Sequence, residues 1–335
     1  MVLYNTLSAL QRAQLIDEAG KDRLTLSFYK YHWIQNPRAF RDELFTVWEK
    51  LDVLGRIYVA EEGINAQLSV PAEQFPSFRE HLENYPFMRG IRLNIAVEHD
   101  NKSFLKLKIK VRKKIVADGI EDETFDASNT GTHLQASEFN EIMSQDDTLV
   151  VDMRNHYESE IGHFQGAITP NVDTFRDSLG LIVEELKSYK QDKKLVMYCT
   201  GGIRCEKASA YFKHQGFTKV FQLEGGIIEY LRQVKSMGLE NKFLGKNFVF
   251  DERRAERISE VVVSTCHLCS SPCDTHNNCR NNACNILFIQ CTACSEKLSE
   301  CCSEECQTIA ALPFENQKKL RKGNSSSARY FKKRN

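Results

Sequence analysis

No stretch of this 335-residue sequence approaches the ~20 consecutive apolar residues of a transmembrane helix. The N-terminus, from Met1 to Asn5, also lacks the basic region and following apolar run of a secretory signal. Net charge is absent as well, since 45 basic residues balance 45 acidic ones, which argues against a surface that is basic throughout. We therefore expect a cytoplasmic protein with no membrane partner and no DNA partner.

Cysteine is missing from the chain before Cys199, and this distribution decides how the twelve cysteines are interpreted. Cys199 and Cys205 lie mid-chain, and the other ten fall between Cys266 and Cys306. Without an export signal the thiols are expected to be reduced. The cluster therefore favours a metal site or redox chemistry over structural disulfides.

The length exceeds what one hydrophobic core usually organises, so we expect several domains. The apolar fraction of 41% and the charged fraction of 27% are those of a chain that mostly folds. The fold class that we predict is multidomain, α+β followed by α/β. Its parts are an N-terminal domain at 1–117, a linker at 118–132, a catalytic domain at 133–240, a Cys-rich segment at 241–312 and a basic, disordered tail at 313–335.

The N-terminal domain shows the order strand, helix, strand, strand, helix, strand, with further strand material after it. This order predicts a ferredoxin-like (acylphosphatase-like) split βαβ unit, a sheet with helices on one face. The periodicity places strands at 24–29, 55–60, 64–69, 91–97 and 104–111, and helices at 37–54 and 72–84.

Lysines alternate with apolar residues at the end of this domain, which puts their ammonium groups on one face of a strand. One interpretation is an edge strand that uses lysine to prevent edge pairing. The other is an RNA-contact surface. The basic residues concerned are Lys106, Lys108, Lys110, Arg112, Lys113 and Lys114.

Four residues after the first strand offer a similar choice: Tyr29, Tyr31, His32 and Trp33. They either stack on an RNA base or pack in the core.

The central domain alternates buried strands with helices, which predicts a mostly parallel sheet with sites at the carboxyl ends of its strands. At the end of one such strand lies the loop Cys199-Thr200-Gly201-Gly202-Ile203-Arg204-Cys205. Backbone N–H groups of a glycine-rich turn, the positive end of the following helix and Arg204 would together stabilise a thiolate at Cys199. We therefore expect a depressed pKa for Cys199. Cys205 is either a resolving thiol or a packed helix-start residue.

The Cys-rich segment contains two C-x-x-C pairs, Cys266 with Cys269 and Cys291 with Cys294, in a spacing that resembles a zinc ribbon. Structural zinc is the first expectation for these four. An iron–sulfur cluster also takes four thiolates, and the third interpretation is free cysteines or partial disulfides. The remaining cysteines suffice for a second four-coordinate site. A charged helix is expected around 251–260.

The loop at Cys199, together with Val151 to Arg154, Glu158 and Gly162 to Ile168, resembles the rhodanese domain, in which the active cysteine carries a persulfide. On this resemblance Asp152 and Arg154 brace the loop, although a buried ion pair without chemical role is the alternative. With Gly55 to Asn65, Leu223 to Ile227 and Cys301 to Cys306, residues 1–312 resemble the bacterial rhodanese-containing tRNA uridine hydroxylases.

That resemblance implies O2-dependent 5-hydroxylation of the wobble uridine (U34), with the tRNA anticodon stem-loop as partner. O2 would be the co-substrate, and the electron donor is unknown. Cys199 would be the essential cysteine, with Arg204 and Cys205 beside it. Either Cys199 adds to uridine C6, or it carries the oxygen or sulfur species itself. The alternative activity is sulfurtransfer to a small-molecule, protein or tRNA acceptor.

Overall fold

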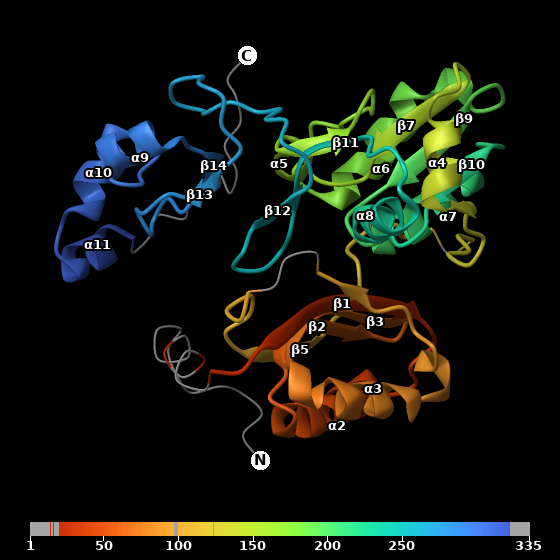
Figure 1. Ribbon diagram of the computed structural model, residues 1–335, viewed down its shortest axis with the longest axis horizontal. Coiled ribbons are helices and arrows are strands. Elements are labelled where there is room, and N and C mark those ends of the chain that lie inside the picture. Colours follow the sequence, from red (N-terminus) through yellow and green to blue (C-terminus); the bar gives the residue numbers. More distant parts are fainter. Residues whose placement is uncertain (1–13, 15, 17–19, 97–99, 123, 322–335) are drawn as a thin grey trace.

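The computed structural model describes residues 14, 16, 20–96, 100–122 and 124–321. It contains an N-terminal sheet domain, a central parallel-sheet domain and a cysteine-rich lobe (Figure 1). None of the described helices is both long and apolar enough to span a bilayer. The predicted multidomain α+β and α/β class is confirmed.

The N-terminal domain is one five-stranded sheet in the order β4-β1-β3-β2-β5. All neighbouring pairs are antiparallel except β2 and β5, which run parallel. The first four strands form the predicted split βαβ unit, and β5 extends its edge. The elements are β1 (Arg23–Tyr31), α2 (Pro37–Lys50), β2 (Leu54–Ala60), β3 (Gly63–Pro71), α3 (Phe75–Glu83), β4 (Asn94–Ile95) and β5 (Leu107–Val111).

Both helices of this domain cover the same face of the sheet (Figure 1). Trp48 of α2 and Phe78 of α3 pack on Phe28 of β1, and all three side chains are buried. Alternation along each strand therefore sends the other half of the side chains to the helix-free face. That second face is turned toward the central domain.

Of the four aromatic residues expected after the first strand, Tyr29 and Tyr31 lie within β1, and their hydroxyls donate to Glu206 and to the Ile203 carbonyl of the central domain. The His32 ring stacks on Phe87 at 4.5 Å. Trp33 is 68% exposed, so core packing is wrong for this residue.

The central domain is built on a four-stranded parallel sheet, β6-β10-β9-β7. One face carries α6 and α7 and the other carries α4 and α8, each over its own hydrophobic cluster. Its elements are β6 (Thr132–Leu134), α4 (Ala136–Ile142), β7 (Thr148–Asp152), α5 (His156–Ser159), β8 (Gly162–Phe164), α6 (Phe175–Glu185), β9 (Lys194–Tyr198), α7 (Ile203–His214), β10 (Val220–Leu223) and α8 (Gly226–Met237).

The cysteine-rich segment begins as part of the central domain, because β11 (Phe243–Phe248) pairs with β8. β12 (Ala255–Arg257) pairs with β11, so the charged helix expected at 251–260 is wrong: the chain forms a turn and a strand there. The lobe itself holds β13 (His276–Asn278), β14 (Leu287–Ile289), α9 (Thr292–Lys297), α10 (Glu304–Ala310) and α11 (Phe314–Arg321). Helix α11 lies within the range expected to form the tail, and 322–335 lie outside the described residues.

A buried lysine connects the first two domains. Lys207 of α7 lies 2.7 Å from Glu62, in the β2–β3 turn, and also pairs with Asp118 of the segment expected to be a linker. Lys207 and Asp118 are almost fully buried. Because a buried charge is costly without its partner, this pair fixes how the two domains meet.

We expect Lys207→Met to lower the free energy of unfolding by about 3 kcal/mol, because it leaves the buried Asp118 carboxylate with Lys114 as its only cation. The measurement is the midpoint of denaturant unfolding. Lys194→Met is the matched control, since Lys194 pairs with Asp147 at 2.9 Å near the surface. Equal effects in the two variants would contradict a buried anchor.

Candidate active site at the Cys199 loop

Cys199 follows directly after β9, at the carboxyl end of a central strand. The loop turns back on itself, so that the Gly202 N–H donates to Cys199 Sγ at 3.2 Å. Gly202 adopts φ +96°, a conformation that favours glycine. From the other side, the first turn of α8 holds the loop: the Ile227 and Ile228 N–H groups donate to the Cys199 and Thr200 carbonyls.

The pKa of Cys199 lies at about 6, below its ordinary value near 9. Burial raises this pKa, but a hydrogen bond from the Cys205 thiol, the charge of Arg204 and backbone N–H groups outweigh it. Cys199 is therefore mainly a thiolate at neutral pH, as expected from the sequence. The Cys205 pKa moves the other way, well above its ordinary value, because Cys205 is buried and faces the neighbouring sulfur.

Arg204 lines the cavity, but its guanidinium is paired with a buried carboxylate. Its guanidinium forms two hydrogen bonds with Glu158, at 2.6 and 2.9 Å, and Glu158 is fully buried. A third contact, 3.3 Å long, reaches the Thr200 hydroxyl. Burial lowers the pKa of Arg204, but the Glu158 carboxylate raises it by more. The pKa therefore lies above its ordinary value, and the guanidinium remains charged. Arg204 thus acts on Cys199 as a fixed charge.

Asp152 and Arg154 form a fully buried pair beside the loop. Arg154 donates to both Asp152 oxygens and, at 2.6 Å, to the Gly162 carbonyl of β8. Its guanidinium also lies over the ring of Tyr198, 5.7 Å from the centroid. The pair therefore joins the ends of β7, β8 and β9 just before Cys199, and it does not line the pocket.

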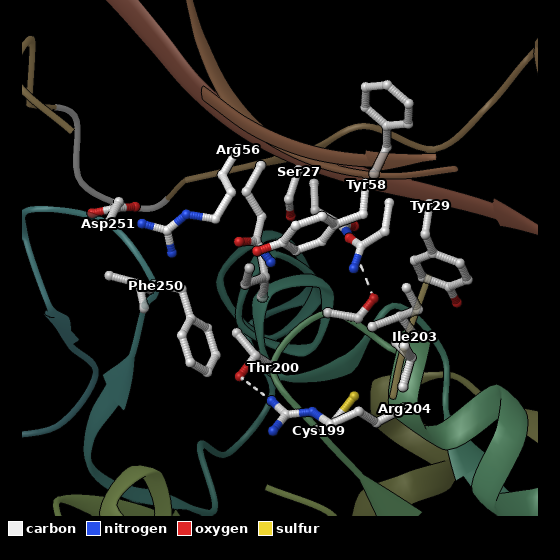
Figure 2. Close-up of a pocket in the computed structure, with 18 of the residues that line it drawn as sticks. Ser27, Tyr29, Arg56, Tyr58, Cys199, Thr200, Ile203, Arg204, Phe250 and Asp251 are labelled. Carbon is white, nitrogen blue, oxygen red and sulfur yellow. Dashed lines mark hydrogen bonds between the residues drawn. The ribbon is translucent and has the colours of Figure 1, made fainter. Parts of the chain in front are cut away.

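The loop faces a cavity of about 410 Å³ between the two domains. One wall is the helix-free face of the N-terminal sheet, with Ser27, Arg56 and Tyr58, and the floor carries Cys199 and Thr200 (Figure 2). A volume of this size accommodates a small organic ligand.

The third wall of the cavity comes from the turn after β11, which contributes Phe250 and Asp251 (Figure 2). This wall was not predictable from the sequence, because the charged residues at 251–260 favour a helix there and because no local pattern links residue 250 to residue 199. Glu158 belongs to the motif that resembles rhodanese, but its pairing with Arg204 was not predicted, because no local pattern links residue 158 to residue 204.

Asn94 carries an unpartnered polar atom at the cavity. It is 6% exposed, and its Nδ2 contacts the Gly201 carbonyl at 3.4 Å. Its Oδ1 is buried without a hydrogen-bond partner among the described residues. A buried acceptor without a donor is costly, so this oxygen is suited to accept from a bound ligand.

The basic residues of β5 continue the cavity wall outward. Strand register places Lys108 beside Arg56 and Lys110 beside Tyr58, on the same face of the sheet. The pKa of Lys108 lies below its ordinary value, mainly because of the neighbouring Lys110 charge and to a smaller extent because of burial. Lys114 pairs with Asp118. Among the described residues, no ion pair involves Arg56, Lys106, Lys108, Lys110, Arg112 or Lys113, and Arg112 lies over the Tyr58 ring.

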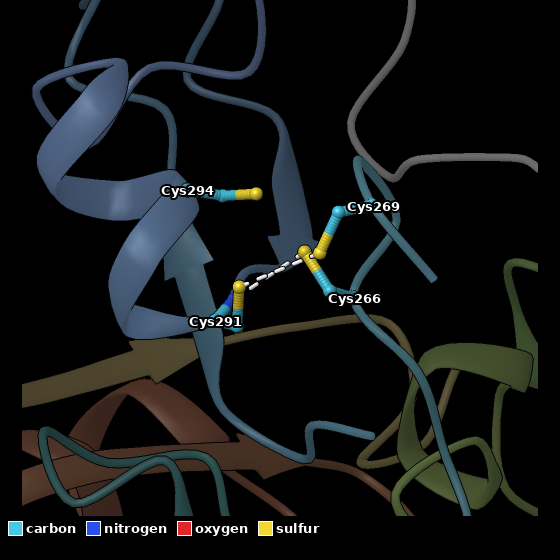
Figure 3. Close-up of side chains that lie close together, drawn as sticks. All are labelled: Cys266, Cys269, Cys291 and Cys294. Carbon is cyan, nitrogen blue, oxygen red and sulfur yellow. Dashed lines mark hydrogen bonds between the residues drawn. The ribbon is translucent and has the colours of Figure 1, made fainter. Parts of the chain in front are cut away.

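Cys266, Cys269, Cys291 and Cys294 come together outside this pocket, with their sulfur atoms within 4.8 Å of one another (Figure 3). They are the four residues expected from the two C-x-x-C pairs. A second group of four thiols lies in the same lobe. Both groups have the donor set of a soft metal ion.

Three family models match successive parts of the chain: a UPF0176 acylphosphatase like domain at 23–115, a rhodanese-like domain at 135–233 and a rhodanase C-terminal domain at 244–307. A tRNA uridine(34) hydroxylase of Escherichia fergusonii is 52% identical over 335 residues, covering 99% of this chain and 95% of the relative. The chain belongs to the tRNA uridine(34) hydroxylase family.

Other members of the family match at the same level. One from Leptospira interrogans is 53% identical and covers 95% of this chain and 86% of its own length. Another, from Cronobacter sakazakii, is 52% identical and covers 99% and 95%. The resemblance drawn from the sequence motifs is thereby confirmed.

We expect the alkylation rate of Cys199 by iodoacetamide, followed on its peptide by mass spectrometry, to rise through a midpoint near pH 6. In Cys205→Ala the midpoint should move up by about 1 pH unit, the worth of one hydrogen bond to a charged sulfur. Cys205→Ser is the matched control, since its hydroxyl still donates. An unchanged midpoint in Cys205→Ala would disprove the role of Cys205 in stabilising the thiolate.

Proposed function

We propose that this protein hydroxylates C5 of the wobble uridine, U34, in tRNA. The observation that carries the proposal is the Cys199 thiolate on the floor of a cavity between the two domains. Family membership over almost the whole chain supports the same reaction. An anticodon loop offers unstacked bases, which such a cavity can accept one at a time.

The cavity wall supports recognition of a uracil ring. Uracil presents one N–H donor at N3 between two carbonyl acceptors. The unpartnered Asn94 Oδ1 supplies an acceptor for such a donor. Tyr58 provides aromatic surface on the same wall as Asn94, and Phe250 provides it on the third wall, so a base can stack on either ring.

Basic residues beside the cavity support an RNA partner. Lys108 and Lys110 extend the row that begins with Arg56 and Tyr58 inside the cavity. Phosphates flanking the target uridine would lie along this row. Since β5 is also the edge strand of its sheet, the same lysines protect the edge, and the two interpretations are compatible.

In the proposed chemistry the Cys199 thiolate adds to C6 of the uracil, which makes C5 nucleophilic. C5 then takes one oxygen atom from O2, the C5 proton leaves, and the thiolate is released. The second oxygen atom becomes water, so a separate donor must supply two electrons and two protons. Cys205 and Arg204 act by holding the thiolate charge before attack and after release.

The first thiol group is proposed to hold structural zinc. Cys269 Sγ and Cys291 Sγ are 3.6 Å apart, and the Cys291 N–H donates to Cys266 Sγ at 3.4 Å. Cys266 packs in one cluster with Tyr157, Ile161 and Phe248 of the central domain, and Phe250 packs against that cluster. A metal here would fix the turn that forms the third wall of the cavity.

We expect tRNA from cells lacking this protein and any parallel hydroxylation route to contain no 5-hydroxyuridine derivatives. Wild type should restore them, and Cys199→Ser should leave them below a hundredth of the wild-type level, because serine is not ionised at neutral pH. Nucleoside mass spectrometry makes the measurement. Unchanged 5-hydroxyuridine with reduced 2-thiouridine would instead favour sulfurtransfer, as would turnover of thiosulfate without RNA.

Replacing Lys108 and Lys110 together by Gln should weaken tRNA binding and reduce the slope of log Kd against log salt by about 1.4, the value for two phosphate contacts of a single strand. Fluorescence anisotropy at several salt concentrations would measure this. Lys193→Gln with Lys219→Gln is the matched control, because these lysines lie at the amino ends of β9 and β10, opposite the Cys199 loop. Equal slopes for both double variants would rule out phosphate contacts at β5.

A further inference from the structure

The second thiol group lies in the cysteine-rich lobe, which holds α9 and α10 (Figure 1), and its last member belongs to α10. Its members, Cys279, Cys284, Cys302 and Cys306, have all four sulfur atoms within 4.8 Å of one another. Cys302 Sγ is 3.7 Å from both Cys284 Sγ and Cys306 Sγ. A tetrahedral ion with metal–sulfur bonds of about 2.3 Å needs sulfur separations of about 3.8 Å.

The same separations speak against an iron–sulfur cluster. In a four-iron cluster each cysteine binds a different iron, and the inorganic core lies between the thiolates. Such a core would push the four sulfurs well beyond the distances found in this group. The space between them suits one ion.

The N–H donors around the sulfurs repeat those of the first group. The Cys302 N–H donates to Cys279 Sγ at 3.5 Å, as the Cys291 N–H does to Cys266 Sγ. Asn281 Nδ2 adds a second donor to Cys306 Sγ at 3.4 Å. Amide donors aimed at sulfur stabilise thiolates, and they commonly surround the ligands of a bound metal.

The ligand pairs of the two groups alternate along the chain. The first and third pairs, at 266–269 and 291–294, form one group, and the second and fourth, at 279–284 and 302–306, form the other. The β13–β14 hairpin separates them: its Ile289 end leads to the first group, and its Asn278 end leads to the second. The chain between the two pairs of each group therefore carries one pair of the other group.

The outer part of the lobe has little apolar core of its own. Its buried cluster consists of Cys279, Phe288 and Cys301, of which two are cysteines. A segment this small usually needs a metal or disulfides for stability. All twelve cysteines are free in the structure.

We propose that Cys279, Cys284, Cys302 and Cys306 bind a second Zn²⁺ ion, so that the lobe is a two-zinc module with alternating ligand pairs. Zinc fits because it prefers four thiolates in tetrahedral geometry and leaves no open position. This proposal does not rest on the hydroxylase reaction, since metal content is measured without tRNA or O2.

The test is the metal content of the full-length protein purified without chelators under reducing conditions, by elemental analysis and native mass spectrometry. Two zinc ions per chain are expected. Cys284→Ser and Cys306→Ser should each lose one zinc ion, whereas Cys301→Ser should keep both. Cys301 is the matched control, because it is buried beside Cys302 and lies outside the group of four.

One zinc ion or none in the wild type, or iron in place of zinc, would overturn the proposal. So would a Cys301→Ser variant that loses as much zinc as Cys284→Ser. If a variant does not fold, the number of zinc ions bound by the wild type still tests the proposal. Replacement of zinc by Co²⁺ in the wild type gives a second measurement. Two tetrahedral cobalt–thiolate sites should then appear, with twice the absorbance of one.

Discussion

A buried charge needs a partner, and the arrangement around Cys199 follows from how Arg204 meets this requirement. Glu158 takes the guanidinium in two hydrogen bonds, and Glu158 itself is fixed because it caps α5. The cation is therefore held beside the sulfur without covering it. A charge fixed in this way lowers the energy of the thiolate and needs no reorganisation when substrate arrives.

Several segments that are distant in sequence depend on this pair. Tyr157, next to Glu158, packs against Phe248, and three members of the first cysteine group lie in or against the same cluster. Phe250 lies in the turn after β11, and the Arg204 guanidinium lies over its ring, 5.9 Å from the ring centroid. The cysteine-rich lobe, α5 and the loop are thus parts of one packed unit, although more than a hundred residues separate their ends. This packing fixes the position of Phe250 and therefore of the third wall of the cavity.

The sequence predicted what depends on local order. Period-two and helical patterns located the strands and helices of the N-terminal unit, and the glycine-rich loop identified Cys199. The two C-x-x-C pairs identified the first thiol group. What depends on register across strands was not predictable: nothing near Lys108 says that it lies beside Arg56. The turn at Phe250 was not predicted, because its charged residues are also typical of a surface helix. The exposure of Trp33 was not predicted, because an exposed aromatic side chain has no local sequence signature.

The alternating order of the cysteine pairs also has a consequence for biosynthesis. A chain leaves the ribosome from its N-terminus, so the last thiol of the outer group, Cys306, is made after both sheet domains. Both sheet domains can fold while the lobe is still being made. The turn that carries Phe250 follows both sheets in the sequence, so a chain made only as far as α8 would expose a formed Cys199 loop before the third wall of the cavity is in place.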